Sequence, residues 1–371
     1  MTEEYLNPAK RLTGVTLPDG WLVGDILPTG RRYGGTGGFF SISYEVSKGS
    51  KTAFLKAFDI FTSFEKARSA KQNFTSVLLA HLQAYDFETK LHDICANKNM
   101  KRIVKILAHG HVELPPLERE QISTVPYMIM EMADGGDVRN YIGRTDYIDL
   151  SLKLYYLRDI ASGLIQLHGA HIAHQDLKPS NIMIFGGALA KIGDLGRASK
   201  RDIESSNDSF PIAGDYAYAP PEQLYGYELK SWKDRRQRCD LYQFASLISY
   251  LFFDSSLNAI YRERLPVAII PVAWEGDHDS YMDALPYLQQ VFNEVLAEWQ
   301  LLLPQWLAHE IIDVIRQCGT PVFGERGSRK VINPDSPDLG INRFVSQFDK
   351  LGFRASLEAK KLGKQKREAA S

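Results

Sequence analysis

The residues best suited to chemistry lie between positions 174 and 196 of this 371-residue chain. Asp176, Lys178 and Asn181 fall within six residues of one another, and Pro179 prevents a helix from running through them. We therefore predict a loop that presents one acid, one cation and one amide to a common space.

A hairpin that follows this loop is expected to bring a second acid beside it. Residues 182–185 are apolar and typical of a short strand, two glycines supply a turn, and residues 190–193 form a second strand. The hairpin would return Asp194 to the side of Asn181. Because magnesium prefers oxygen ligands, these two side chains are predicted to hold it. The alternative is an ordinary hairpin with polar surface residues.

The combined pattern resembles the catalytic and metal-binding loops of the protein kinases, His-Arg-Asp-Leu-x-x-x-x-Asn followed by Asp-Phe-Gly. The chain departs from it at Gln175, where the family usually has Arg, and at Leu195, where it usually has Phe. The resemblance implies that Asp176 orients the acceptor hydroxyl and takes its proton, and that Lys178 neutralises charge on the transferred phosphoryl group. The matching positions are His174, Asp176, Leu177, Asn181, Asp194 and Gly196.

A glycine-rich stretch lies between two predicted strands rather than before a helix, which argues against a Rossmann or Walker site. It is similar to the kinase flap whose backbone covers the phosphates. By this resemblance Gly35, Gly37 and Gly38 bind the nucleotide, Phe40 replaces the third glycine of the pattern, and Ile42 replaces its valine. A flexible turn is the alternative.

The third strand of this region contains a lysine in apolar surroundings, Ala53-Phe-Leu-Lys56. Burying an unpaired ammonium group is costly, so a lysine in this strand is expected to have a partner or a ligand. The alternative is a lysine that is exposed on an edge strand. The kinases carry Val-Ala-Ile-Lys here, and the resemblance implies that Lys56 binds the α- and β-phosphates. In the kinases the partner glutamate lies at a characteristic distance before the next strand, and the resemblance therefore implies that Glu88 rather than Glu65 pairs with Lys56.

The run from 127 to 137 is an apolar strand that ends in a turn, and it resembles the kinase hinge. The resemblance implies that Met130 lines the nucleotide pocket, that the backbone of Glu131 and Ala133 reads the adenine edge, and that Asp137 reaches the ribose. It also places the base among three apolar side chains: Ala53, Ile42 and Met183.

Residues 194–222 resemble the kinase activation segment, which closes with Gly-Thr and then Ala-Pro-Glu. Here Asp215 replaces the threonine. We predict that Asp215 accepts a hydrogen bond from Lys178 and that its charge raises the pKa of Asp176.

Three further residues are expected to have structural roles. The resemblance implies that Arg326 pairs with Glu222 and that Asp240 holds the backbone of the catalytic loop from below. His174 is interpreted as a buried brace of that loop rather than as a base.

The resemblance implies an α+β, bilobal protein-kinase fold. A small antiparallel β-sheet lobe with one main helix, about residues 20–133, would precede a larger, mainly α-helical lobe, about 134–350. Residues 1–19 are interpreted as an N-terminal lead-in, and the basic residues 351–371 as a flexible tail.

The composition limits the partners and the cellular location that we expect for the protein. The net charge of −1 gives no indication of nucleic acid as a partner, and three widely spaced cysteines show no disulfide or metal pattern. The sequence contains no apolar run of signal or membrane-spanning length. We therefore expect a soluble, cytoplasmic protein without membrane or nucleic-acid partners.

The resemblance implies a serine/threonine protein kinase that uses ATP with Mg²⁺ or Mn²⁺ and acts on proteins, itself among the candidate substrates. Because Gln175 replaces the arginine that would read a phosphate, activity is expected not to depend on activation-loop phosphorylation. Two alternatives stay open: a pseudokinase acting as a nucleotide-binding scaffold, and a small-molecule kinase. Phe40, Gln175 and Asp215 favour the pseudokinase slightly, whereas the complete set of catalytic residues argues against it.

Overall fold

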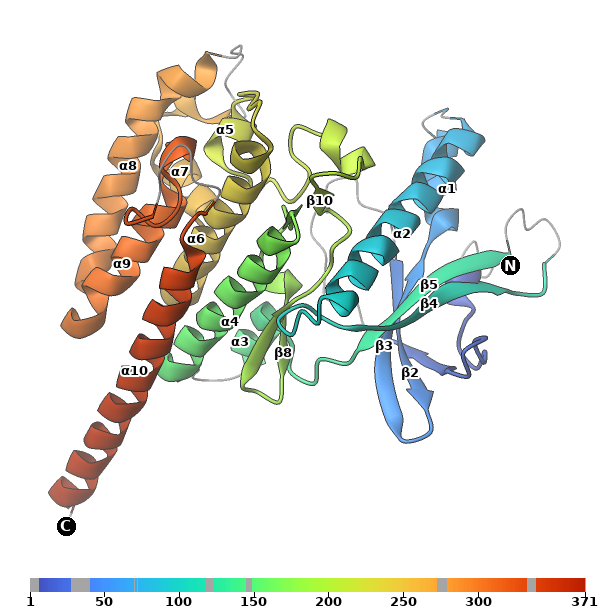
Figure 1. Ribbon diagram of the computed structural model, residues 1–371, viewed down its shortest axis with the longest axis horizontal. Helices are drawn as coiled ribbons and strands as arrows, with labels where there is room; N and C mark the ends of the chain where they lie inside the picture. The colour runs from blue at the N-terminus through green and yellow to red at the C-terminus, as the bar shows by residue number, and fades with distance from the viewer. Residues whose placement is uncertain are drawn as a thin grey trace. The chain divides into compact units, whose positions relative to one another are not determined.

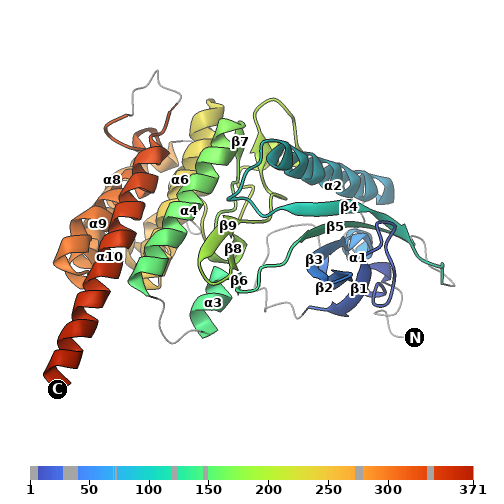
Figure 2. The ribbon, with the colours of Figure 1, turned by 60° about the horizontal axis from the view of Figure 1, so that its bottom comes forward.

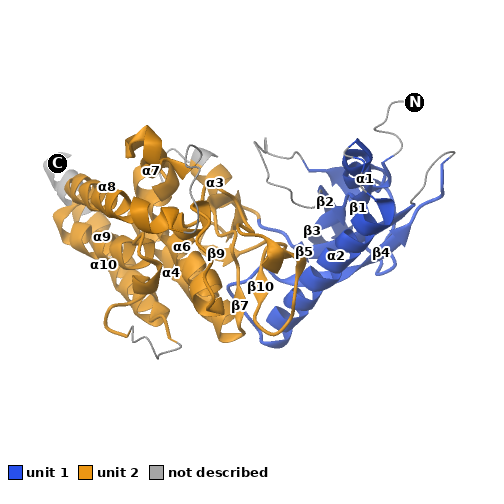
Figure 3. Ribbon diagram, turned by 90° about the horizontal axis from the view of Figure 1, so that it is seen from above, with its two compact units in different colours: residues 1–133 blue, residues 134–371 orange. Residues whose placement is uncertain are grey.

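The computed structural model, drawn in Figure 1 and Figure 2, describes residues 7–27, 41–69, 71, 73–117, 123–144, 149–271, 279–331 and 338–370. The chain forms two compact units, residues 1–133 and 134–371, which Figure 3 colours separately. The division falls where the sequence analysis placed the boundary between two lobes. Among the described helices, none offers an apolar stretch long enough to span a bilayer.

Unit 1 is built on a five-stranded antiparallel sheet in the order β1-β2-β3-β5-β4. The two strands predicted around the glycine-rich stretch and the third strand that contains Lys56 form β1, β2 and β3, as expected. The strands are β1 (Leu22–Ile26), β2 (Ser41–Lys48), β3 (Lys51–Phe58), β4 (Ile106–Glu113) and β5 (Thr124–Glu131).

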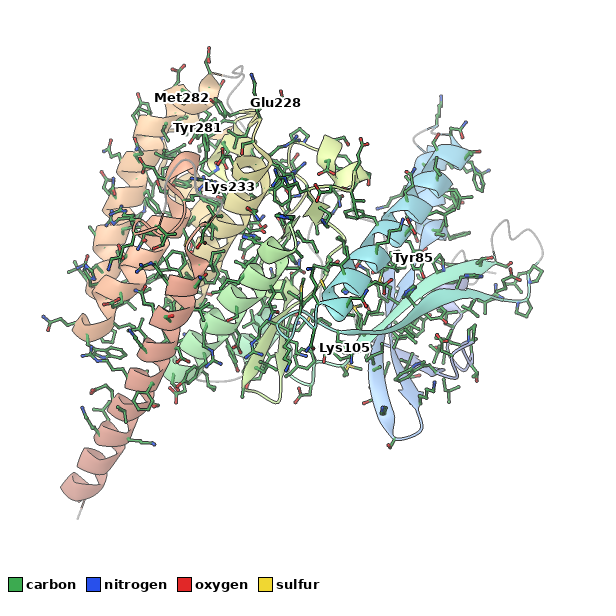
Figure 4. The ribbon with its side chains drawn as sticks, in the orientation of Figure 1. Tyr85, Lys105, Glu228, Lys233, Tyr281 and Met282 are labelled. Carbon is green, nitrogen blue, oxygen red and sulfur yellow. The ribbon has the colours of Figure 1, made fainter. Side chains whose placement is uncertain are left out.

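Two helices, α1 (Ile60–Ser69) and α2 (Phe74–Asn97), follow β3, where the resemblance implied one main helix. Helix α2 begins where the Asn73 side chain accepts hydrogen bonds from two backbone N–H groups of the first turn, which is the usual role of asparagine at that position. The helix is tied to the sheet by Tyr85 (Figure 4), whose hydroxyl donates to the Gly110 carbonyl at 3.0 Å.

The segment interpreted as a lead-in is part of the domain from Asn7 onward, which corrects the boundary at residue 19. Its apolar side chains, among them Leu12 and Leu17, are buried in the same cluster as Tyr44 and Leu55 of the sheet. The Tyr44 hydroxyl donates to the Ala9 carbonyl at 2.7 Å. These residues cover one face of the sheet, which would otherwise expose apolar surface to water.

Unit 2 is mainly helical, as predicted. Its helices are α3 (Val138–Arg144), α4 (Leu150–Gly169), α5 (Pro221–Leu224), α6 (Arg238–Phe253), α7 (Leu257–Arg264), α8 (Ser280–Leu302), α9 (Gln305–Gly319) and α10 (Ile341–Ala370). Short helical turns are η3 (Pro179–Asn181), η4 (Ser206–Ser209), η5 (Lys233–Gln237), η6 (Val267–Ile269) and η8 (Phe323–Glu325).

Two small sheets carry the loops of interest in this unit. One has the order β6-β8-β9, with β6 (Gly136–Asp137), β8 (Ile182–Phe185) and β9 (Leu189–Ile192). The other pairs β7 (Ile172–Ala173) with β10 (Ser199–Lys200). Helices α4 and α6 supply much of the core, because most side chains along one face of α4 and nearly all of α6 are buried.

Residues 351–370 of the predicted flexible tail instead continue α10, the helix that packs along α4 in both Figure 1 and Figure 2. The boundary at residue 351 falls inside this helix. Phe344, Phe348, Leu351 and Ala355 are all buried and recur at helical spacing, so one apolar stripe continues across the expected boundary. The basic composition of the segment concealed this stripe from the sequence analysis.

Candidate functional site

In unit 1 the structure brings Lys56 and Glu88 together. The Nζ atom of Lys56 on β3 lies 2.7 Å from Oε1 and 3.1 Å from Oε2 of Glu88 on α2. The two side chains are 15% and 4% exposed, so the ammonium group is largely withdrawn from water and is matched by a buried carboxylate. Such a pair fixes the lysine head in one place.

The strand period corrects the prediction for Ala53 and Ile42. Alternate residues of a strand share a face, so Ala53 lies on the face opposite Lys56. Both Ala53 and Ile42 pack in the cluster covered by the N-terminal segment. Phe54, rather than Ala53, shares the face of Lys56, and Met130 of β5 lies directly opposite Phe54.

The hinge residues lie at the end of unit 1. Met130 is buried on the face of Lys56, as a pocket-lining role requires. The N–H of Glu131 donates to the Lys105 carbonyl at 3.0 Å, and its side chain accepts from the Lys105 N–H at 2.8 Å. A role for Glu131 in reading adenine would therefore use its carbonyl oxygen. Ala133 is partly exposed at the last position of the unit.

The glycine-rich flap, with Gly35, Gly37 and Gly38, lies outside the residues that the structure describes.

In unit 2 the loop around Asp176 converges on one carboxylate. Asp176 is 6% exposed; its Oδ1 accepts the N–H of Asp215 at 2.8 Å, and its Oδ2 accepts from Asn181 Nδ2 at 3.1 Å. Lys178 Nζ lies 3.0 Å from the same Oδ2. The acid, the cation and the amide predicted from the sequence therefore meet at the Asp176 side chain.

Asp215 accepts from Lys178, with Oδ2 3.3 Å from Nζ, as predicted. Burial raises the pKa of Asp176, and the charge of Asp194 raises it further, against the lowering effect of Lys178. The predicted cause was therefore wrong, because the charge of Asp215 is not among the main contributions and its N–H donates to Asp176. Burial alone would lower the pKa of Lys178, but the carboxylates of Asp176 and Asp215 outweigh it and raise that pKa.

The loop is held from below by α6, which confirms the role predicted for Asp240. Its carboxylate accepts the backbone N–H of His174 at 2.9 Å and of Gln175 at 2.7 Å. The sequence analysis missed Gln243, whose side chain accepts the Leu177 N–H at 2.9 Å and donates to the Gln175 carbonyl at 2.8 Å. Its spacing of three from Asp240 places both on one helical face, a signal available in the sequence.

His174 is a fully buried brace. Its Nε2 lies 2.9 Å from the Gly193 carbonyl, and its Nδ1 lies 3.2 Å from the Asp176 N–H. Because a carbonyl only accepts and an N–H only donates, the ring must carry its hydrogen on Nε2. The histidine thus joins the catalytic loop to the loop that bears Asp194.

Asn181 and Asp194 lie at the open end of the β8-β9 hairpin, where the Gly193 N–H donates to the Asn181 carbonyl at 2.8 Å. Asn181 Nδ2 donates to Asp176, so the amide oxygen is the side-chain atom suited to a cation. Among the described residues, no three His, Cys, Asp or Glu side chains gather as a metal site. One carboxylate and one amide oxygen fit magnesium, which takes few protein ligands and completes its shell with water and phosphate oxygens.

The last two predicted nucleotide contacts are neighbours across a sheet. Asp137 of β6 pairs in register with Met183 of β8. The Asp137 carboxylate also accepts from the Asn140 N–H at 2.9 Å and from its side-chain amide at 2.6 Å, so it caps the first turn of α3.

The end of the activation segment is anchored by the predicted ion pair, which the structure confirms. Arg326 donates through both Nη atoms to Glu222, at 2.6 and 2.7 Å. The side chains are 0% and 1% exposed, and the guanidinium carbon lies 4.9 Å from the centre of the Tyr242 ring. A bidentate, buried pair of this kind specifies geometry as well as charge.

Comparison with known proteins points to one family. Residues 81–263 match the family model described as "Protein kinase domain". The chain is 35% identical over 155 residues to "Serine/threonine-protein kinase atg1" of Dictyostelium discoideum, a match that covers 38% of this chain and 23% of that protein.

It is also 27% identical over 234 residues to "LysM domain receptor-like kinase 10" of Oryza sativa subsp. japonica, covering 60% of this chain and 37% of that protein. A third match, 27% over 223 residues, is to "Hormonally up-regulated neu tumor-associated kinase" of Mus musculus, covering 57% and 30% respectively. The matches thus span well under half the length of these relatives.

The family-model match includes the loop that contains Asp176 and the helix that contains Glu88, and the two units have the expected α+β architecture. Over residues 81–263, the chain thus has the sequence of a protein kinase domain.

Proposed function

We propose that the protein is a serine/threonine protein kinase that transfers the γ-phosphoryl group of ATP to a protein hydroxyl. The observation that carries this proposal is the set of contacts around Asp176. A buried carboxylate with a raised pKa lies 3.0 Å from a lysine and is steadied by an asparagine and a backbone N–H. These groups could hold an acceptor hydroxyl at Asp176, next to the positive charge of Lys178.

In the proposed reaction, Asp176 accepts a hydrogen bond from the acceptor hydroxyl and takes its proton as the oxygen attacks phosphorus. The bond from the γ-phosphorus to the bridging oxygen breaks, and ADP leaves with that oxygen. Lys178 stabilises the negative charge on the phosphoryl oxygens, while Asp215 limits the positions that the lysine head can adopt. Most of the rate would come from positioning and charge stabilisation.

Lys56 is proposed to bind the α- and β-phosphates, with Glu88 holding its head. Asn181 and Asp194 would hold Mg²⁺, or Mn²⁺ in its place. When bound, the cation would neutralise charge on the phosphates. The proposed contacts to the adenine base are Met130, Met183, the carbonyl of Glu131 and the backbone of Ala133. Asp137 is proposed to contact the ribose. The phosphates are proposed to lie against the glycine-rich flap, with Gly35, Gly37 and Gly38.

A protein substrate is favoured by the anchored Pro-Pro-Glu ending of the activation segment, because Glu222 is fixed by Arg326. Lysine two residues after the catalytic acid resembles the serine/threonine group of the family. Names of similar proteins such as "Serine/threonine-protein kinase atg1" agree with this choice. The protein itself is a candidate substrate, and activity is proposed not to require phosphorylation of the activation segment.

Transfer from γ-labelled ATP tests the proposal. The chain would be assayed with magnesium on itself, on a generic basic protein and on small hydroxyl acceptors, and the labelled protein would be hydrolysed to identify the phosphoamino acid. We expect phosphoserine or phosphothreonine. Label found only on a small acceptor would establish the small-molecule kinase, and ATP binding without transfer to any acceptor would establish the pseudokinase.

A further inference from the structure

One buried arginine outside the predicted site contacts the catalytic loop. Arg236 lies in η5, just before α6, and is 1% exposed. Its Nη1 donates to the side-chain oxygen of Gln175 at 2.7 Å, and its Nη2 donates to the carbonyl of Asp208 at 3.1 Å. The Asp208 carboxylate accepts from the same Nη2 at 3.3 Å. Arg236 therefore joins the residue before Asp176 to the activation segment.

Gln175 depends on this contact for its orientation. Its backbone is left-handed, with φ of 64°, and is held by hydrogen bonds to both Asp240 and Gln243. Its Nε2 is buried and has no hydrogen-bond partner among the described residues. If the side-chain amide of Gln175 were rotated by 180°, its NH₂ group would face the Arg236 guanidinium, and both groups are donors. Arg236 therefore selects the orientation in which Gln175 Oε1 faces the guanidinium, although this leaves Nε2 without a partner among the described residues.

Asp208 fixes the activation segment at several points besides Arg236. Its carboxylate accepts from Ser199 Oγ at 2.7 Å and from the Ser205 N–H at 2.9 Å. The preceding Asn207 is buried and donates to the carbonyls of Gly196 and Ala198 at 3.1 and 3.2 Å. The turn η4 is thereby fastened to the residues that directly follow Asp194.

We propose that Arg236 is a positioning residue that keeps the catalytic loop and the activation segment in register, with Asp208 as its permanent counter-charge. This inference rests on the proposed kinase function and deepens it. A genetically encoded aspartate supplies the negative charge that a phosphorylated side chain would otherwise have to bring to the segment. The link is complete in the unmodified chain, so the active arrangement needs no phosphate.

The test compares Arg236→Met and Asp208→Asn with wild type after phosphatase treatment, with loss of phosphate verified by mass spectrometry. Arg264→Met is the control, because Arg264 forms an exposed bidentate pair with Glu298 of α8 at 2.7 Å. Two readouts are needed: kcat and KM for ATP, and amide hydrogen exchange of residues 196–210.

We expect dephosphorylated wild type to keep its activity. Arg236→Met should lower kcat about tenfold or more with KM for ATP within about twofold, because the acid is misplaced while nucleotide binding is untouched. Asp208→Asn keeps its shape and should lower kcat about threefold. Both should speed exchange of residues 196–210, and Arg264→Met should do neither. Arg236→Lys, which keeps the charge, should recover part of the loss.

The double variant provides an internal check, because two residues of one link are not additive. The kcat of the variant that combines Arg236→Met and Asp208→Asn should equal that of Arg236→Met alone. If the two residues acted independently, the two fold-losses in kcat would multiply. Unchanged kcat and exchange in both single variants would overturn the inference, and so would loss of wild-type activity after phosphatase treatment. If wild type transfers no phosphate at all, the proposed function fails. In that case the hydrogen-exchange data alone test the positioning role of Arg236. Unchanged exchange of residues 196–210 in Arg236→Met would overturn that role.

Discussion

A single methyl group added at Gly214 should impair catalysis strongly while the protein still folds. A Cβ atom there would overlap the carbonyl oxygen of Gln175, and it would lie 2.9 Å from Oδ1 and 3.1 Å from Cα of Asp176. Non-bonded carbon atoms settle about 3.5–4.0 Å from their neighbours, so the loop would have to move by on the order of 1 Å.

The loop cannot make this movement without breaking its supports. The Gln175 carbonyl is held by Gln243 at 2.8 Å, and Asp176 Oδ1 is held by the Asp215 N–H at 2.8 Å. A misplacement of about 1 Å at a reacting group typically costs about 10²-fold in rate. We therefore expect Gly214→Ala to lower kcat about 10²-fold, whereas the overpacking should cost about 1–3 kcal/mol of stability.

Steady-state phosphate transfer and thermal unfolding, measured on the same preparations, check this prediction. Gly169→Ala is the control, because a Cβ atom at Gly169 would meet no atom within 4 Å. It should leave kcat unchanged. A folded Gly214→Ala variant with kcat within about threefold of wild type would refute the reasoning, since the loop would then tolerate the displacement.

Three further predictions concern the supports of the site and the stability of unit 1. Arg326→Met leaves a buried carboxylate without its partner, so it should cost about 3–5 kcal/mol and lower Tm by roughly 6–20 °C in calorimetry; a shift below about 2 °C would contradict this. Glu88→Gln releases the head of Lys56 and should raise the Kd for ATP in titration calorimetry, whereas Asp86→Asn, in an exposed pair, should not. Burial lowers the pKa of His81 to about 4, below about 6.5 in the unfolded chain. The unfolded chain therefore takes up the proton first as pH falls, and up to about 3 kcal/mol of stability should be lost between pH 6.5 and 4. His81→Leu should remove that part of the pH dependence in denaturant titrations, and an unchanged pH profile would count against it.

The sequence alone predicted which functional residues lie together when these residues are close to one another in the chain. Asp176, Lys178 and Asn181 could be placed together because they share one short loop that a proline keeps from being helical. The pairings of Glu88 with Lys56 and of Arg326 with Glu222 rested on resemblance rather than on physics, because each joins residues far apart in the chain.

Other features depend on contacts that spacing alone does not reveal. Ala53 was assigned to the wrong face because motif matching ignored the two-residue period of a strand. The link through Arg236 and Asp208 joins three separate segments, and no local pattern marks it. The close approach of Gly214 to Asp176 is visible only when the two backbones are placed in space.

The central claim is that Asp176 serves as the acid–base group of phosphoryl transfer, and Asp176→Asn tests it most directly. The substitution keeps the size of the side chain and still accepts the Asp215 N–H, but it cannot take the proton of the acceptor. The measurement is the single-turnover rate of γ-phosphate transfer at saturating magnesium and ATP, with ATP affinity determined in parallel. We expect a rate lower by roughly 10²–10⁴-fold at nearly unchanged affinity. A rate close to that of wild type would contradict it.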